Sequence, residues 1–228
     1  MLGSDGFIGK TDNPIKDREG IPQGTIGFLC NQMKCFFFSL NTFAFSYFFE
    51  IVFCISHTNA FKIINHISKN YAEIIVGAGT ILSTAQLEKA IESGASFGVA
   101  PGIDPYVIEE SKKLNFTFAP GICTPSEIQL ALKYELNLLK FFPAEYSGGL
   151  DYLKSIAAPF IQNDLKFIPL GGININTAKK YLHSNLVAAI GGSWIANSSL
   201  IVDGNWKEIE KRANEIHKLV AKVREPRL

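Results

Sequence analysis

Hydrophobic positions after about residue 59 alternate between short β-branched or aromatic runs and stripes with helical spacing. The runs predict strands at 74–76, 97–100, 116–119, 138–142, 166–170 and 187–190. The stripes predict helices that begin near Asn59, Ser83, Asp104, Thr124, Gly149 and Asn174 or Asn176, and a closing helix that carries Ile209, Ala213, Ile216 and Val220. Strand then helix recurs about every 20 to 28 residues, which is typical of parallel strands joined by helical crossovers.

The N-terminal part of the chain has a weaker pattern. Residues 1–24 are polar and rich in glycine and proline, which predicts an arm or tail. Strands are expected at Thr25–Cys30 and Phe48–Ile55, with a helix at Asn31–Ser46 between them. These units raise the total to eight, so we predict one α/β domain over 25–228, a (β/α)8 TIM barrel with an irregular N-terminal segment. The first strand is not followed by G-x-G-x-x-G, which argues against a dinucleotide-binding fold.

Composition narrows the class of protein. Of the residues, 47% are hydrophobic and the formal net charge is +1, so neither disorder nor a nucleic-acid partner is indicated. The four cysteines lack C-x-x-C spacing and a zinc pattern with the histidines, which is typical of reduced thiols in a cytoplasmic protein. No secretory signal is expected. The phenylalanine-rich segment Cys35–Ile55 has nearly the length of a membrane span, but Glu50 favours a buried helix and strand instead.

Lys140 lies within the apolar run Leu138–Phe142, which has the composition of a buried strand. Buried lysine is rare, and low dielectric favours its neutral amine, a nucleophile that forms Schiff bases with carbonyls. Lys140 shares one strand face with Leu138 and Phe142, and it would lie at the C-terminal end of the sixth strand, where TIM barrels carry their chemistry. The alternative is a lysine that extends its ammonium group into solvent from a strand end.

Two glycine pairs follow the last two predicted strands, Gly171-Gly172 and Gly191-Gly192, and Ser193 comes next. TIM barrels often bind phosphate at these two loops, and glycine lets backbone N–H groups approach an anion. Tight turns without a ligand are the alternative explanation.

A Schiff-base enzyme also needs a group that moves protons. Glu50 is predicted to be that general acid–base, because a carboxylate among apolar neighbours on the second strand has its pKa raised by desolvation. Glu145 is a competing candidate, for which we expect instead a role in capping the following turn.

Over roughly Ile74–Val220 the sequence resembles the class I aldolases for 2-keto-3-deoxy-6-phosphogluconate (KDPG) and 4-hydroxy-2-oxoglutarate (KHG). The resemblance rests on Val76-Gly77-Ala78-Gly79-Thr80, Ala100-Pro101-Gly102, Pro120-Gly121-Ile122, Lys140-Phe141-Phe142-Pro143-Ala144-Glu145, Gly171-Gly172-Ile173 and Gly191-Gly192-Ser193-Trp194.

This resemblance implies a trimeric, cytoplasmic TIM-barrel lyase that uses no metal or other cofactor and binds a phosphorylated keto acid, with no nucleic-acid or membrane partner. Lys140 would form the Schiff base and Glu50 would be the general acid–base. Thr80, Pro101 and Phe142 would line the keto-acid pocket. The phosphate would be held by Gly171, Gly172, Gly192 and Ser193.

The sequence departs from the family pattern at several positions. The arginine that usually follows the strand-two glutamate is absent, about two extra residues stand there, and no first-strand arginine is found. Leu170 stands where a threonine is common. The alternative function is therefore a catalytically weak barrel that binds a phosphorylated metabolite. A metal-dependent aldolase is disfavoured, because no histidine stands at a clear strand end.

Overall fold

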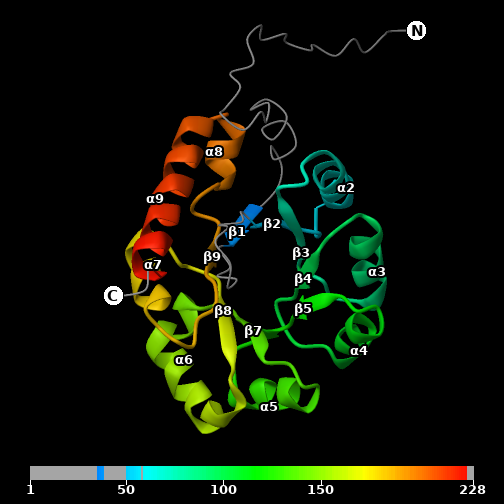
Figure 1. The fold of residues 1–228 in the computed structure, drawn as a ribbon, viewed down its shortest axis with the longest axis vertical. Coiled ribbons are helices and arrows are strands. Elements are labelled where there is room, and N and C mark those ends of the chain that lie inside the picture. Colours follow the sequence, from blue (N-terminus) through cyan, green and yellow to red (C-terminus); the bar gives the residue numbers. More distant parts are fainter. Residues whose placement is uncertain (1–34, 39–49, 58, 225–228) are drawn as a thin grey trace, which may run out of the picture.

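The computed structural model describes residues 35–38, 50–57 and 59–224. The expected arm at 1–24 and the expected strand Thr25–Cys30 lie outside the described residues. Figure 1 shows the strands around a central axis, with the helices on the outside of them.

The described strands and helices follow the predicted alternation from residue 50 onward. The strands are β1 (Cys35–Phe38), β2 (Glu50–Cys54), β3 (Ile75–Gly79), β4 (Phe97–Val99), β5 (Thr117–Ala119), β6 (Gly121–Ile122), β7 (Leu138–Phe141), β8 (Lys166–Pro169) and β9 (Gly191–Gly192). The α-helices are α2 (Ala60–Asn70), α3 (Thr84–Glu92), α4 (Pro105–Lys113), α5 (Pro125–Lys133), α6 (Gly149–Ala157), α7 (Ile175–Leu182), α8 (Ser198–Val202) and α9 (Trp206–Arg224). Two 3-10 helices, η1 (Glu145–Ser147) and η2 (Ala158–Asn163), precede and follow α6.

Local capping explains where several helices begin. The side chains of Ser83 and Asp104 accept hydrogen bonds from backbone N–H groups in the first turns of α3 and α4. Thr124 and Asn174 form complete capping boxes at α5 and α7, which confirms Asn174 rather than Asn176 as the N-cap. Asn59 precedes α2 as expected, but its side chain makes no cap hydrogen bond.

The strands close into a ring. One sheet has the order β5-β4-β3-β2-β1-β9 and the other β6-β7-β8. Only Pro120 separates β5 from β6, so these two strands continue one another around the ring. On the other side, Phe167 of β8 forms a parallel bridge with Val187, and the chain then runs into β9. A strand was predicted at 187–190. The structure has a single bridge at Val187 instead, and the short strand β9 begins at Gly191. The fold is the predicted α/β TIM barrel.

The first strand differs from the prediction. A helix was expected over Asn31–Ser46, but Cys35–Phe38 is the strand β1, which pairs antiparallel with both β2 and β9. Only residues 39–49 join β1 to β2, and a parallel crossover needs a dozen residues or more. An antiparallel pair is the arrangement that so short a connection allows.

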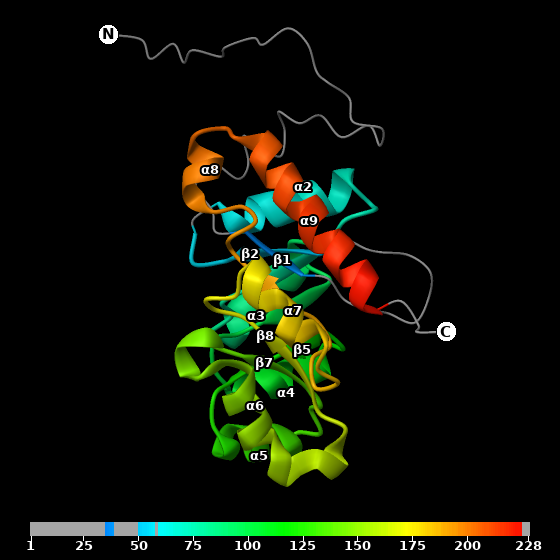
Figure 2. The same cartoon turned by 90° about the vertical axis from the view of Figure 1, so that its left-hand side faces the viewer.

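Hydrophobic side chains fill both the inside of the ring and the space between ring and helices. The inner cluster comprises Val52, Val99, Ala119, Ile168, Leu170 and Ala189, with Phe97, Leu138 and Phe142 packed against it. Figure 2 shows α9 crossing the outside of the barrel, where it packs on α7 and α8. None of the helices in the described part of the chain has the length and hydrophobicity needed to cross a membrane.

Gly121 allows two neighbouring strand ends to meet. A Cβ atom at this position would lie 2.2 Å from the carbonyl carbon and oxygen of Pro101, which are backbone atoms and cannot rotate away. Gly121→Ala should therefore lower the free energy of unfolding by about 1–3 kcal/mol. Denaturant titration measures the change, with Gly102→Ala as control, because a Cβ at Gly102 meets nothing within 4 Å. Equal stability of the two variants would contradict the prediction.

Candidate active site

Lys140 projects into the barrel from β7. Its backbone N–H donates to the carbonyl of Pro120 at 2.8 Å, and its Cα is in register with Gly121 and with Ile168. The residue is 6% exposed, and its Nζ lies 4.8 Å from the centre of the Phe142 ring. Because Lys140 alternates with the outward residues Leu139 and Phe141, the strand itself turns the amine inward.

Burial decides the charge state of this amine. Desolvation lowers the pKa of Lys140 from 10.5 to about 8, and the charge of the Cys54 thiolate acts in the opposite direction. No hydrogen bond or ion pair holds Nζ among the residues that the structure describes. A sizeable fraction of the amine is therefore neutral near pH 8, and the neutral form attacks carbonyl carbon.

Cys54 and Thr80 meet at the C-terminal ends of β2 and β3. The Sγ of Cys54 is hydrogen-bonded to Oγ1 of Thr80 at 2.9 Å and to Oγ of Ser56 at 3.0 Å. Thr80 has a φ of 66°, a left-handed conformation that is an outlier for a β-branched residue. Such strain is concentrated at functional sites. The structure thus places Thr80 at the mouth of the barrel.

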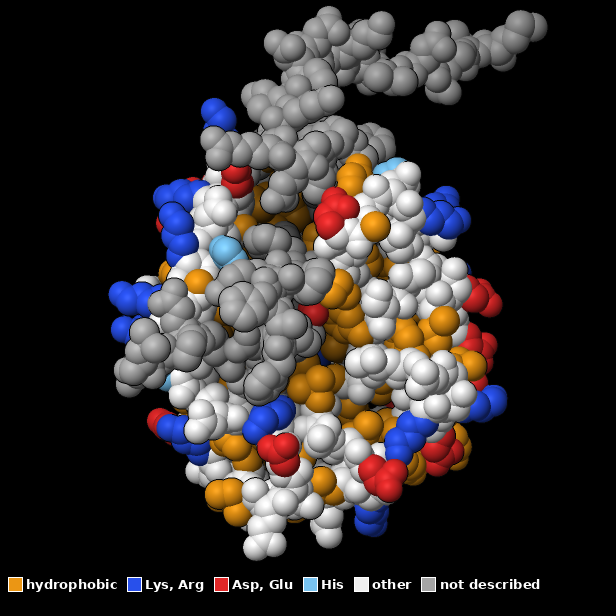
Figure 3. Space-filling view, in the orientation of Figure 1, with side chains coloured by type: hydrophobic (Ala, Val, Ile, Leu, Met, Phe, Trp, Pro, Cys, Tyr) orange, Lys and Arg blue, Asp and Glu red, His pale blue; other side chains and the backbone are white. Residues whose placement is uncertain are grey.

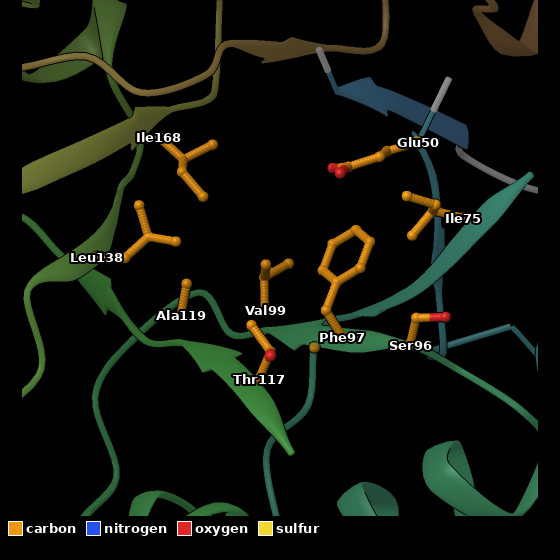
Figure 4. A pocket seen from close by; sticks show the side chains of 10 residues that line it. Glu50, Ile75, Ser96, Phe97, Val99, Thr117, Ala119, Leu138 and Ile168 are labelled. Atoms are coloured by element: carbon orange, nitrogen blue, oxygen red, sulfur yellow. The ribbon is translucent and has the colours of Figure 1, made fainter. Parts of the chain in front are cut away.

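Glu50 faces the barrel interior from the beginning of β2. It is the first residue of β2, and with Phe97 and Leu138, the first residues of β4 and β7, it lines a cavity of about 200 Å³ (Figure 4). The residue is 4% exposed, and within the described residues its Oε2 atom has no hydrogen-bond partner. Burial raises the pKa of Glu50 to about 7. The carboxyl group is therefore partly protonated at neutral pH.

The order of layers separates Glu50 from Lys140. In TIM barrels, side chains of alternate strands form one layer. Glu50, Phe97 and Leu138 make the lowest of these layers. Two residues further along the same strands come Val52, Val99 and Lys140. The level of Lys140 on β2 is thus occupied by Val52, while the Glu50 side chain enters a cavity that Val99 and Ile168 also line. Neither group contributes to the pKa shift of the other.

The two double-glycine loops adjoin each other and the lysine strand. Gly171 and Gly172 have φ values of 98° and 81°, so both need a residue without Cβ. A Cβ at Gly171 would lie 3.2 Å from the Phe142 ring, and one at Gly192 would lie 3.1 Å from the carbonyl oxygen of Ile173. The loops after β8 and β9 therefore pack together beside the residue that contacts Lys140.

The remaining predicted substrate ligands surround the same mouth. Pro101 follows β4, and the carbonyl of the adjacent Gly102 accepts a hydrogen bond from Gly121 at 2.9 Å. Ser193 follows β9 and is exposed, so its hydroxyl is free to meet a ligand from solvent. On the face of the molecule that Figure 3 shows, hydrophobic side chains gather around a hollow near the middle, while charged side chains lie mostly along the edge.

Glu145 differs from what its sequence context suggested. It was expected to cap a turn, but its carboxylate instead forms an ion pair with Lys180 at 3.1 Å and accepts a hydrogen bond from the Tyr181 hydroxyl. Cys54, which the sequence indicated only as one of four reduced cysteines, is a half-buried free thiol at the end of β2.

Within the described ranges, no group of three or more His, Cys, Asp or Glu side chains is close enough to hold a metal ion.

These features define a class of protein: a TIM barrel whose interior amine, near two adjoining double-glycine loops, suits Schiff-base chemistry. Comparison with known proteins gives the family. The family model described as KDPG and KHG aldolase matches residues 48–212. The chain belongs to this aldolase family, whose members are carbon–carbon lyases.

Relatives of known name agree with this assignment. The chain is 40% identical over 152 residues to the KHG/KDPG aldolase of Escherichia coli K12, covering 67% of this chain and 70% of the relative. It is 37% identical over 147 residues to the 2-dehydro-3-deoxy-phosphogluconate aldolase of Haemophilus influenzae, covering 64% and 68%.

A solved structure of KDPG aldolase from Legionella pneumophila, with pyruvate captured as a covalent carbinolamine intermediate, superposes with a TM-score of 0.68. It is 30% identical and the match covers 75% of this chain and 79% of that one. The aldolase of Zymomonas mobilis ZM4 with 3-phosphoglycerate is 32% identical, with a TM-score of 0.62 and coverage of 71% and 78%.

The lowered pKa of Lys140 predicts how its reactivity changes with pH. Only the neutral amine reacts with cyanate, so carbamylation of Lys140 should rise with pH and reach half its maximum near pH 8. Peptide mapping by mass spectrometry measures this, with the exposed helix residue Lys154 as reference for the reagent. If the carbamylation rate at Lys140 still rises steeply above pH 10, the pKa of its amine is not lowered and the prediction is wrong.

Proposed function

We propose that the chain is a class I aldolase that cleaves KDPG to pyruvate and glyceraldehyde 3-phosphate through a Schiff base on Lys140. The observation that carries this is the buried, partly neutral amine of Lys140, which lies beside Phe142 and the adjoining glycine loops. Family membership supports the same reaction. The aldol cleavage of KHG to pyruvate and glyoxylate needs the same amine, and we include it in the proposal.

The amine begins the reaction. Neutral Nζ of Lys140 adds to the C2 ketone of the substrate, and loss of water gives a protonated imine. Cleavage of C3–C4 then leaves its electron pair as an enamine, for which the iminium nitrogen is the electron acceptor. The apolar interior around Lys140 strengthens this electrostatic effect, because little water screens it.

The substrate phosphate is assigned to the glycine loops. Backbone N–H groups of Gly171, Gly172 and Gly192 can approach an anion closely, because no Cβ stands in the way. The Ser193 hydroxyl adds a hydrogen bond at the exposed edge. Thr80, Pro101 and Phe142 surround the keto-acid end, nearest the amine.

Three further expectations come from the family resemblance. Glu50 stays the predicted general acid–base, because its buried carboxyl group faces the barrel interior and its pKa is raised to about 7. A homotrimer and a cytoplasmic location also stay predictions. The mass of the assembly in solution checks the trimer.

Lys140→Arg should abolish cleavage while preserving the fold, because a guanidinium does not lose its proton and cannot form the imine. Incubation with pyruvate and borohydride should leave a stable adduct at Lys140 in the original chain and none in the variant, as read by peptide mass. Lys166→Arg, on the neighbouring strand, is the matched control. If the original chain forms no adduct, the alternative function is favoured, which is a barrel that binds a phosphorylated metabolite without cleaving it.

Ser193→Ala should weaken the reaction with the phosphorylated substrate selectively. Loss of one hydrogen bond to a charged group at this exposed edge, worth about 1–2 kcal/mol, should lower kcat/KM for KDPG about 5- to 30-fold. Cleavage of KHG, which has no phosphate, should be unchanged. Ser155→Ala on α6 serves as control. Equal losses for both substrates would remove Ser193 from the phosphate site.

A further inference from the structure

Glu145 lies against the loop that joins β8 to α7, residues 170–174, which we call the β8 loop. The backbone N–H of Glu145 donates to the carbonyl of Gly171 at 2.9 Å. A Cβ atom at Gly172 would lie 2.8 Å from the Cβ of Glu145, so the side chain of Glu145 packs directly on the second glycine. One residue of η1 therefore contacts both glycines of the β8 loop.

The carboxylate of Glu145 is bonded to the helix that follows this loop. Its Oε1 accepts a hydrogen bond from the hydroxyl of Tyr181 and lies 3.1 Å from Nζ of Lys180, which also donates to Oε2 at 3.2 Å. Tyr181 is fully buried, and burial together with the hydrogen bond to Glu145 raises its pKa, so its hydroxyl remains a donor. Both partners belong to α7. Glu145 thus connects the beginning of the β8 loop to the helix at the end of it.

The first residue of α6 closes the space around this carboxylate. A Cβ atom at Gly149 would lie 3.3 Å from Oε1 of Glu145, 3.4 Å from Nζ of Lys180 and 3.5 Å from the hydroxyl of Tyr181. The three polar groups therefore converge on the backbone at the beginning of α6, which lies near α7 on the outside of the ring (Figure 1). Enclosure between two helices holds the Glu145 side chain in one position.

The hydrogen bond from Glu145 also decides where the β8 loop directs its own donors. The carbonyl of Gly171 and the N–H of Gly172 belong to one planar peptide unit, which is trans, so they point in opposite directions. Because the carbonyl is turned toward Glu145, the N–H of Gly172 is turned away from it. The N–H groups of Gly171 and Gly172 donate to no other group in the described part of the chain. Successive free N–H groups of this kind form an anion-binding concavity.

We propose that Glu145 is a positioning residue for the substrate phosphate, which fixes the β8 loop so that the N–H groups of Gly171 and Gly172 face the phosphate of KDPG. This inference rests on the proposed function and deepens it, because it names the side chain that orders the phosphate site. Glu145 does not itself bind the phosphate. Its ion pair with Lys180 offsets a negative charge that would otherwise disfavour an anion nearby.

A ligand with phosphate and one without it separate this role from a general loss of structure. KDPG carries the phosphate, whereas pyruvate occupies only the keto-acid end and is measured by borohydride trapping on Lys140. Glu145→Ala removes both bonds to α7. Glu145→Gln keeps the size of the side chain and an oxygen that accepts from Tyr181. Glu110→Ala is the matched control, because Glu110 forms an ion pair with a lysine at 3.0 Å and its side chain is 19% exposed, against 22% for Glu145.

We expect Glu145→Ala to raise KM for KDPG about tenfold or more and to lower kcat by less, because the phosphate lies away from the reacting bonds. The pyruvate concentration that gives half-maximal trapping should be unchanged. Glu145→Gln should restore most of the affinity for KDPG, and Glu110→Ala should behave as the original chain.

Equal losses of affinity for KDPG and pyruvate in Glu145→Ala would overturn the proposal, as would a KM for KDPG within about twofold of the original value. If Glu145→Ala does not fold, Tyr181→Phe, which removes one donor to the carboxylate and keeps the ring, is judged by the same two ligands. Failure of the original chain to trap pyruvate at all would refute the proposed function instead.

Discussion

Removal of one ammonium group from water is the constraint on which the rest of this structure depends. The fall in the pKa of Lys140 from 10.5 to about 8 corresponds to about 3 kcal/mol at about 1.4 kcal/mol per pKa unit. Because the folded chain binds this proton less well than the unfolded chain, the cost is present in full below about pH 8. It vanishes as the pH rises above 10.5. A closed ring of strands with helices outside it is the kind of fold that can bear that cost, since its large core offsets it.

The same closure fixes what can meet the amine. Inside the ring, height along the strand decides which side chains are neighbours, and a shift of two residues moves a group by one layer. Glu50 and Cys54 face the same interior, yet one lines the lower cavity and the other meets Thr80 at the mouth. The alternation of a strand brings groups to the same face. It does not bring them to the same level.

Patterns among residues close together in the chain were enough to predict much of the fold. Capping residues and glycines marked where helices and strands begin and end, and the inward direction of Lys140 followed from the alternation of β7 alone. The glycine loops after β8 and β9 were also visible, because positive φ and close packing leave no other residue type at Gly171 and Gly172. The reversed strand β1 was not, since the phenylalanine-rich segment before Glu50 satisfies helix and strand patterns equally well.

By itself, the sequence determined the alternating architecture, the buried lysine on β7 and the two double-glycine loops, because each depends on residues adjacent in the chain. Only the tertiary structure decided which side chains meet inside the barrel. Cys54 and Thr80 come from the ends of two neighbouring strands, and their hydrogen bond depends on the register between those strands. The register also decides at which heights Glu50 and Lys140 face the interior, and no local pattern records it.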